Sequence, residues 1–176
     1  LHVVDAVTGK EKFAFVPHEM MKNQKAAFLS ETSSTGGTAS LFYGIDAPWT
    51  AFTQYVSKSN GTLTVKGSER NTDGSTYNSS NTNLELKGLQ WVYGGLRMGG
   101  RSYYALDLSD LDKPSLKFHI NPDAAMTTNA TTGAIEVNTS NALSYMGQSW
   151  SKPTIAYVKF GGVKKLVMFV GGGYDA

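Results

Sequence analysis

The sequence predicts a mainly β protein made of antiparallel strands and many turns. Only 17% of the residues are charged, below the usual share of about 25%. Glycine accounts for 19 of 176 residues and aromatic side chains for 11%, a combination typical of strands joined by tight turns. Short apolar runs alternate along the chain with clusters of Gly, Ser, Thr and Asn. We therefore expect a turn-rich β fold.

The composition also excludes several classes of protein. A chain of 176 residues and 19.0 kDa has about the length of one domain. Its net charge of +2 gives no reason to expect a nucleic-acid partner. No apolar run approaches the roughly 18 residues of a membrane span. The absence of cysteine excludes disulfides, zinc–thiolate sites and thiol chemistry.

The first 17 residues predict a hairpin with strands at 1–4 and 12–16. The Asp5 carboxylate can accept backbone N–H groups across the turn at 5–10, and Gly9 can adopt a positive φ there. A short helix follows over residues 18–30, because several of its larger side chains share one face and it contains no Gly or Pro. Those side chains are Met20, Met21, Gln24, Ala27 and Phe28.

The remaining strands are short and separated by polar segments. They are expected at 41–46, 51–57, 63–65, 84–86, 91–95, 102–108, 115–120, 134–137, 154–160 and 163–170. Polar loops are expected at about 31–40, 67–83 and 121–141, because such segments cannot bury enough apolar surface to offset their ordering entropy. The pair Gly161-Gly162 predicts a two-residue turn of type I′ or II′ between the last two strands.

Two hairpins share one design, which points to repeated blades. Val3-Val4-Asp5 is followed by a polar turn and Phe13-Ala14-Phe15, and Ala105-Leu106-Asp107 is followed by a longer turn and Leu116-Lys117-Phe118. Recurrence of this unit predicts antiparallel four-stranded blades that form part of a β-propeller. Two unrelated hairpins of a β-sandwich would be the alternative.

The number of strands allows about three blades, whereas a ring of six to eight blades needs several hundred residues. We therefore expect residues 1–176 to be one partial β-propeller domain, a fragment of a larger protein, with edge strands that another chain must cover. The chain begins inside an apolar run and stops in a glycine-rich turn, which supports the same interpretation.

No residues stand out as catalytic, cofactor-binding or metal-binding. His2, His18 and His119 lack metal-ligand spacing and fall in different predicted elements, so surface or half-buried roles are expected. The carboxylates of Asp107, Asp110 and Asp112 lack the alternation and glycine of a calcium loop, which favours ordinary turn capping. The same interpretation applies to a polar group in the loop at 67–83, formed by Asn71, Asp73 and Asn78.

The glycine pairs at 94–95 and 99–100 do not form a phosphate-binding loop, because neither GK[ST] nor a following helix is present. Such pairs beside aromatic strands favour tight turns and close backbone packing. Arg97 and Arg101 could form a small recognition patch, or they could be solvated turn residues.

Three stretches resemble the C-terminal β-propeller of the PilC/PilY proteins, which are adhesins and biogenesis factors of the type IV pilus tip. They are residues 1–17 with the turn DAVTGK, residues 92–108 with GGLRMGGRSYYALD, and residues 150–155 with WSKPTI. The segment 43–48 is similar to the family's aspartate-centred strand before the glycine-rich blade. The resemblance covers most of the chain outside the polar loops, and the glycine-rich run is its most specific part.

This resemblance implies a non-enzymatic bacterial surface protein at the pilus tip, exported through the periplasm and outer membrane. It would support pilus assembly against retraction, and hence twitching motility, and would contact minor pilins and host-cell or abiotic surfaces. The family's Ca²⁺ loop has no counterpart in these residues. It is expected C-terminal to Ala176, so no cofactor is expected here.

Two other functions remain open from the sequence. A quinoprotein dehydrogenase also uses propeller turns like DAVTGK, but it needs a planar cofactor and Ca²⁺, often beside a vicinal cysteine pair that this chain lacks. Its docking tryptophan would fall where this chain has Phe13 and Phe15. A scaffold for outer-membrane assembly is the third possibility.

Overall fold

The protein is mainly β, as the sequence predicts, and every strand pairing is antiparallel. The computed structural model describes residues 1–25, 29, 43–57, 62–65, 88–128, 131, 135–137 and 140–173. The strands are β1 (His2–Val4), β2 (Glu11–Ala14), β3 (Thr50–Gln54), β4 (Val56–Ser57), β5 (Leu63–Thr64), β6 (Leu89–Gly94), β7 (Tyr103–Asp107), β8 (Ser115–Ile120), β9 (Met126–Thr128), β10 (Ile135–Val137), β11 (Thr154–Phe160) and β12 (Val163–Phe169). Among the described residues the helical elements are α1 (His18–Asn23) and the 3-10 turns η3 (Arg97–Gly99), η4 (Pro122–Ala125) and η5 (Ala142–Tyr145).

A four-stranded sheet in the order β3-β6-β7-β8 forms the centre of the fold. Neighbouring strands run up and down, and the β4–β5 hairpin is inserted between β3 and β6. Residues Tyr103 to Leu106 of β7 are all buried, because both faces of this strand are covered. The sheet is therefore the middle layer of the structure.

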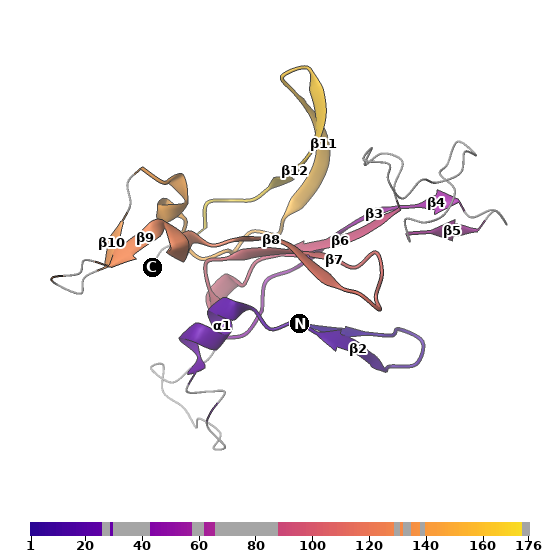
Figure 1. Ribbon diagram of the computed structural model, residues 1–176, viewed down its shortest axis with the longest axis horizontal. Helices are drawn as coiled ribbons and strands as arrows, with labels where there is room; N and C mark the ends of the chain where they lie inside the picture. Colours follow the sequence, from indigo (N-terminus) through magenta and orange to yellow (C-terminus); the bar gives the residue numbers. More distant parts are fainter. Residues whose placement is uncertain are drawn as a thin grey trace.

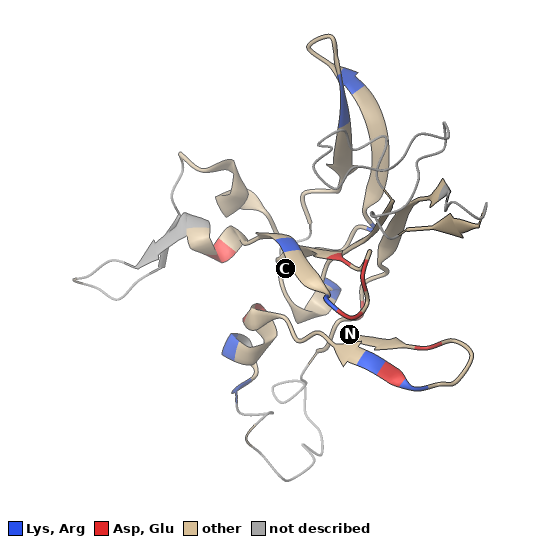
Figure 2. Cartoon of the chain, turned by 45° about the vertical axis from the view of Figure 1, so that its right-hand side comes forward, with Lys and Arg blue, Asp and Glu red and all other residues tan. Residues whose placement is uncertain are grey.

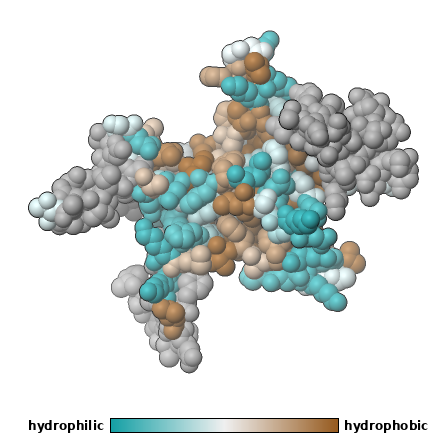
Figure 3. Space-filling view, viewed as in Figure 1, coloured by the Kyte–Doolittle hydropathy of each residue, from teal (hydrophilic) through white to brown (hydrophobic). Residues whose placement is uncertain are grey.

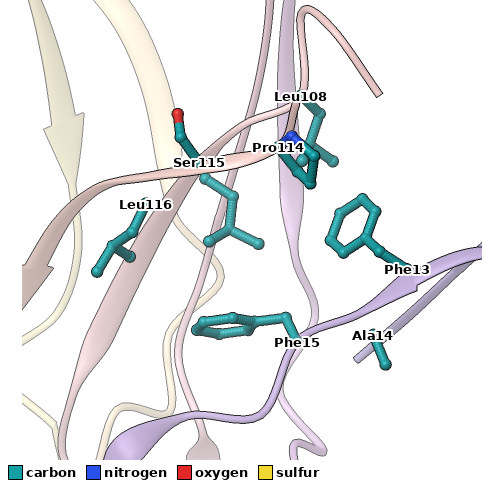
Figure 4. Close-up of a pocket in the computed structure, with 8 residues that line it drawn as sticks. Phe13, Ala14, Phe15, Leu108, Pro114, Ser115 and Leu116 are labelled. Carbon is teal, nitrogen blue, oxygen red and sulfur yellow. The ribbon is translucent and has the colours of Figure 1, made fainter. Parts of the chain in front are cut away.

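Two hairpins cover the two faces of this sheet (Figure 1). On one face, Ile155, Leu166 and Met168 of the β11–β12 hairpin pack against a core of Leu89, Trp91, Tyr93 and Ala105. On the other face, Phe15 meets Tyr104 edge to face, with ring centroids 5.3 Å apart. Phe13 and Phe15 also line an apolar groove of about 190 Å³ together with Leu106, Leu108 and Leu116 (Figure 4).

The turn of the first hairpin follows the predicted mechanism. Asp5 Oδ1 accepts hydrogen bonds from the backbone N–H of Val7 at 3.0 Å and of Thr8 at 2.9 Å. Gly9 has a φ of 69°, which glycine adopts without a Cβ clash. The second predicted turn is also confirmed, because Gly161 and Gly162 both have positive φ, as a type I′ turn requires.

These hydrogen bonds make the Asp5 carboxyl a pH probe of the turn. The N–H groups of Thr8 and Val7 lower the pKa of Asp5 below its ordinary value of 3.8, and the Lys12 ammonium group at 3.7 Å adds to the effect. Since the folded pKa is the lower one, this stabilisation is present above the unfolded pKa and is lost as pH falls through the folded pKa. An NMR titration of the Asp5 carboxyl carbon is expected to give a midpoint below 3.8, with the Val7 and Thr8 amides shifting together with it. A midpoint at or above that value would contradict the turn geometry.

The predicted helix begins where expected but is described only as α1, a helix of six residues. Residues 26–28 and 30 lie outside the described part of the chain. The predicted strand at 41–46 is wrong for its described residues 43–46, which are not in a strand. Their backbone groups face other partners instead: the Tyr43 carbonyl accepts a hydrogen bond from the Gln24 side chain, and the Gly44 carbonyl lies against Gly99.

The predicted polar loops are described only in part. Loops 31–40 and 67–83, and the strand expected at 84–86, lie outside the described residues. The loop at 121–141 contains η4 and the β9–β10 hairpin, which includes the strand expected at 134–137. The strand expected at 51–57 is divided into β3 and β4.

Val65 and Gly88, the described residues on either side of the segment that contains 67–83, lie close together, which makes deletion of 67–83 a clear test. A Cβ on Gly88 would lie 2.8 Å from the carbonyl carbon of Val65, so the chain on either side of residues 66–87 is already in close contact. Deleting 67–83 leaves five residues to span this short gap and reduces the entropy of loop closure. Thermal unfolding of the deletion variant is expected to match the parent to within about 1 kcal/mol. A variant that fails to fold would contradict the assignment of 67–83 as an insertion.

The two similar hairpins share a β-bulge at the same position. Val3 lies opposite Phe13 and Val4 opposite Glu11, so Lys12 is the extra residue. In the same way Ala105 lies opposite Phe118 and Leu106 opposite Leu116, so Lys117 is extra. The order of residues in the two hairpins matches Phe13 with Leu116, whereas the strand register makes Phe13 equivalent to Phe118. The match made from the sequence is displaced by two residues, because it follows the apolar pattern and takes no account of the bulge.

Candidate functional site

Residues 94–102, which contain the glycine-rich run GGLRMGGR, form a tight junction between β6 and β7. Glu19, in the first turn of α1, lies beside this junction and is only 6% exposed. Its Oε1 accepts the backbone N–H of Arg101 at 2.9 Å, and its Oε2 accepts that of Ser102 at 3.1 Å. A buried carboxylate thus satisfies two backbone donors that the turn would otherwise leave unpaired.

Ser149 holds the junction through a second set of hydrogen bonds. Its hydroxyl oxygen accepts the N–H of Leu96 at 2.7 Å, and its own N–H donates to the Gly100 carbonyl at 3.1 Å. Its carbonyl accepts the N–H of Arg97 at 3.2 Å. Ser149 is fully buried, so these hydrogen bonds are protected from water. The junction is therefore fixed by residues distant in sequence on both sides.

The glycines of the junction are required by close packing, as the sequence predicts. A Cβ on Gly94 would overlap the Trp49 ring, and one on Gly95 would lie 2.5 Å from the Ser149 carbonyl oxygen. A Cβ on Gly99 would meet the Gly44 carbonyl, and one on Gly100 would meet the Glu19 carboxylate. Each position therefore admits only hydrogen in place of a side chain.

Arg101 binds other parts of the fold. It is therefore neither part of a recognition patch nor a solvated turn residue, the two roles considered from the sequence. Its Nε donates to the Met146 carbonyl at 2.8 Å, and Nη2 donates to the Ser144 carbonyl at 3.2 Å. Its Nη1 lies 3.2 Å from Asp123 Oδ1, in an ion pair with η4. The guanidinium group ties the junction to the segment that contains η4 and η5.

Arg97, by contrast, remains a candidate recognition residue. Its guanidinium carbon lies 4.5 Å from the ring centroid of Trp150, a cation–π contact, and its Nη1 lies 3.8 Å from Asp46 Oδ2. The side chain is 44% exposed. Arg97 has a φ of 54°, unusual for a residue with a side chain. Asp46 also accepts the N–H of Met98 at 3.2 Å, which holds the carboxylate beside the arginine.

An open hollow lies next to this patch and completes the candidate site. Trp150, Ser151 and Gly171 to Gly173 line a volume of about 520 Å³. A cation, a carboxylate and an aromatic ring thus lie beside the exposed backbone of Gly171 to Gly173. We call Arg97, Asp46, Trp150 and this hollow the junction surface.

The other residues considered from the sequence lie elsewhere. His2 Nδ1 lies 2.5 Å from Glu11 Oε2 on the exposed first hairpin. The His119 ring stacks on Tyr104 with centroids 4.4 Å apart, and burial lowers the pKa of His119. His18 begins α1. Asp107 accepts the N–H of Ser109 and the indole N–H of Trp91, and Asp110 accepts the N–H of Asp112, so turn capping is confirmed for Asp107 and Asp110.

Asn71, Asp73 and Asn78 lie outside the described residues. In the part of the chain that the structure describes, no group of three or more His, Asp or Glu side chains is arranged to hold a metal ion. Sequence reasoning missed Glu19 and Ser149, because their partners are 49 to 83 residues away and no local pattern marks them.

Comparison with known proteins adds no identification. No family model matches the chain, and neither a curated protein nor a solved structure matches it. Among the described helices none is long and apolar enough to cross a membrane.

Proposed function

We propose that this chain is part of a β-propeller and serves as a non-enzymatic, pilus-associated binding module of the PilC/PilY type. In this role it would support the balance between type IV pilus assembly and retraction, and adhesion to surfaces. The observation that carries the proposal is the central sheet, which lies between two hairpins that match its own two halves.

The first hairpin corresponds to the third and fourth strands of the sheet. β1 and β2 share the bulge of β7 and β8 and the aspartate that follows the bulge. They also pack on β7 and β8, through the groove lined by Phe13 and Leu106 (Figure 4). Equivalent strands of neighbouring blades pack on one another in this way in a propeller.

The last hairpin corresponds to the first and second strands of the sheet. Thr50 opens β3 and pairs with Tyr93 of β6, and Thr154 opens β11 and pairs with Phe169 of β12. β11 packs beside β3, where Tyr157 meets Phe52 edge to face with centroids 5.9 Å apart. These correspondences support an order of a half-blade, a complete blade and another half-blade along the chain.

The pilus role rests on the resemblance of residues 92–108, which form β6, the junction and β7. In a propeller, connections between the second and third strands and between blades emerge at one end of the ring. Here the β6–β7 junction, α1 and the segment that contains Ser149 meet at one end of the sheet. The junction surface, with Arg97 and Trp150, would present its charges there to a minor pilin.

A binding experiment with purified minor pilins tests this proposal. The chain is immobilised and the Kd for each pilin is measured, together with Trp150→Ala, which removes the ring under Arg97. Truncating an aromatic anchor at an interface is expected to weaken binding by about tenfold or more. Lys159→Ala, an exposed position on β11, is the matched control and is expected to bind normally. No pilin binding, or tight binding of pyrroloquinoline quinone with dehydrogenase turnover, would refute the proposal.

A further inference from the structure

The β11–β12 hairpin ends in an exposed apolar tip. Phe160 and Val163 lie opposite each other on either side of the Gly161-Gly162 turn, and their exposed fractions are 68% and 59%. Every residue from 159 to 165 is exposed, whereas the base of the hairpin packs on the central sheet. Figure 2 shows the hairpin extending away from that sheet, as Figure 1 does. The apolar tip is therefore separate from the core that holds the hairpin in place.

Three lysines surround this tip on both faces of the hairpin. Lys159 lies directly opposite Lys164, and both side chains belong to one face. Lys165 belongs to the other face, together with Phe160. The ammonium group of Lys165 lies 5.2 Å from the centroid of the Phe160 ring, and that of Lys164 lies 4.4 Å from the centroid of the Tyr157 ring. Cations and aromatic rings therefore lie together on each face of the tip.

The hairpin contains no carboxylate that balances these positive charges. Between residues 150 and 173 the sequence has four lysines and no Asp or Glu. Figure 2 shows basic residues near the tip and no acidic residue on the hairpin. Like charges directly opposite each other destabilise a β ladder, so the pair of Lys159 and Lys164 favours a nearby anion. The tip thus presents positive charge and apolar surface together.

The β1–β2 hairpin differs in this respect, although its turn is also exposed and partly apolar. Val7 in that turn is 94% exposed. The charges of this hairpin, however, are of both signs, and they are carried by Asp5, Lys10, Glu11 and Lys12. Nζ of Lys12 lies 3.7 Å from Oδ2 of Asp5. The β1–β2 hairpin therefore has an apolar tip without an excess of positive charge.

An anionic lipid surface fits both parts of the β11–β12 tip. Lysines close to a bilayer are attracted by anionic lipids, and their long side chains keep the ammonium groups at the level of the headgroups. Phe160 and Val163 would then be buried among the lipids instead of lying in water. A soluble polyanion would bind the lysines but leave these two side chains exposed. In Figure 3 the tip, at the top of the view, shows hydrophobic and hydrophilic surface side by side.

We propose that the tip of the β11–β12 hairpin is a docking site for the surface of an anionic lipid bilayer. Phe160 and Val163 insert between the lipid headgroups. Lys159, Lys164 and Lys165 bind the lipid phosphate groups around them. This site depends on neither the blade assignment nor the pilus role, so it goes beyond the proposed function.

Vesicle flotation with the full chain tests this site. The chain is expected to float with vesicles of phosphatidylcholine and phosphatidylglycerol, and to bind vesicles of phosphatidylcholine alone about tenfold more weakly or less. Binding to the anionic vesicles is expected to weaken as salt rises, because salt screens the lysines. Phe160→Ser and Lys165→Glu are each expected to weaken it by about tenfold. Both residues are exposed, so both variants are expected to fold.

Matched controls lie on the β1–β2 hairpin. Val7→Ser removes an exposed apolar side chain, and Lys10→Glu changes the net charge by the same amount as Lys165→Glu. Both control variants are expected to bind anionic vesicles within about twofold of the parent. Because the chain has no cysteine, a single cysteine can carry an environment-sensitive fluorophore. The emission of a label on Val163→Cys is expected to shift to the blue on anionic vesicles, and that of a label on Val7→Cys is not.

A chain that does not bind anionic vesicles would overturn the proposal. Binding that Phe160→Ser leaves unchanged, or a label at position 163 that stays in water, would also overturn it, because the lysines would then bind anions without insertion. Loss of pilin binding in Lys165→Glu, without any vesicle binding, would assign the tip to an acidic protein surface instead. The vesicle measurement contains no pilin, so it can fail while the proposed function stands, and the reverse also holds.

Discussion

Gly95→Ala is expected to destabilise the protein by about 3 kcal/mol, because the site has no room for a methyl group. The new Cβ would lie 2.5 Å from the Ser149 carbonyl oxygen and 2.7 Å from its hydroxyl oxygen. Ser149 cannot move aside without losing its hydrogen bonds to Leu96, Arg97 and Gly100. Urea unfolding followed by tryptophan fluorescence measures the loss of stability.

Gly44→Ala is the matched control for this substitution. Gly44 is exposed, and a Cβ there would meet no atom within 4 Å. Its unfolding free energy is expected to stay within about 0.5 kcal/mol of the parent. If the two alanine variants were equally stable, the close packing described for the junction would be incorrect.

Glu19→Ala is the second substitution with a large expected effect, about 3 kcal/mol. It leaves the N–H groups of Arg101 and Ser102 buried without their acceptor. Glu19→Gln is expected to lower the free energy of unfolding by less, about 2 kcal/mol, because the amide oxygen of glutamine still accepts one of the two hydrogen bonds.

Hydrogen exchange separates this effect from a general loss of stability. In the Glu19 variants the amides of Arg101 and Ser102 are expected to exchange faster than the amides of β7, which the Glu19 carboxylate does not accept. Lys22→Ala, exposed in the last turn of the same helix, is expected to change neither stability nor exchange. Unchanged protection of the two amides in Glu19→Ala would show that the carboxylate does not hold the junction.

Local rules predicted much of the fold. Asp5 and Gly9 shaped the first turn as expected, and Gly161-Gly162 formed the last one, because turn geometry depends on residues within a few positions. β8 was predicted with its observed bounds from alternation alone. The bulge at Lys12 was missed, since it depends on pairing between strands rather than on either strand by itself.

The site was less accessible to sequence reasoning. The close packing of the junction glycines was predicted, but its causes, Trp49 and Ser149, were not. Arg97 and Arg101 look alike in the sequence, yet one stacks on the half-buried ring of Trp150 and the other donates to backbone carbonyl groups. Only tertiary contacts distinguish them, because their partners lie as many as 53 residues away along the chain.

The hydrogen bonds that Glu19 accepts from Arg101 and Ser102 span 82 and 83 residues. Closing a loop of this size loses more conformational entropy than two hydrogen bonds alone offset. We therefore expect these bonds to form only after the central strands have paired. We therefore expect the helix that carries Glu19 to dock on the assembled sheet late in folding. A nascent polypeptide could not complete this junction until residue 102 had left the ribosome.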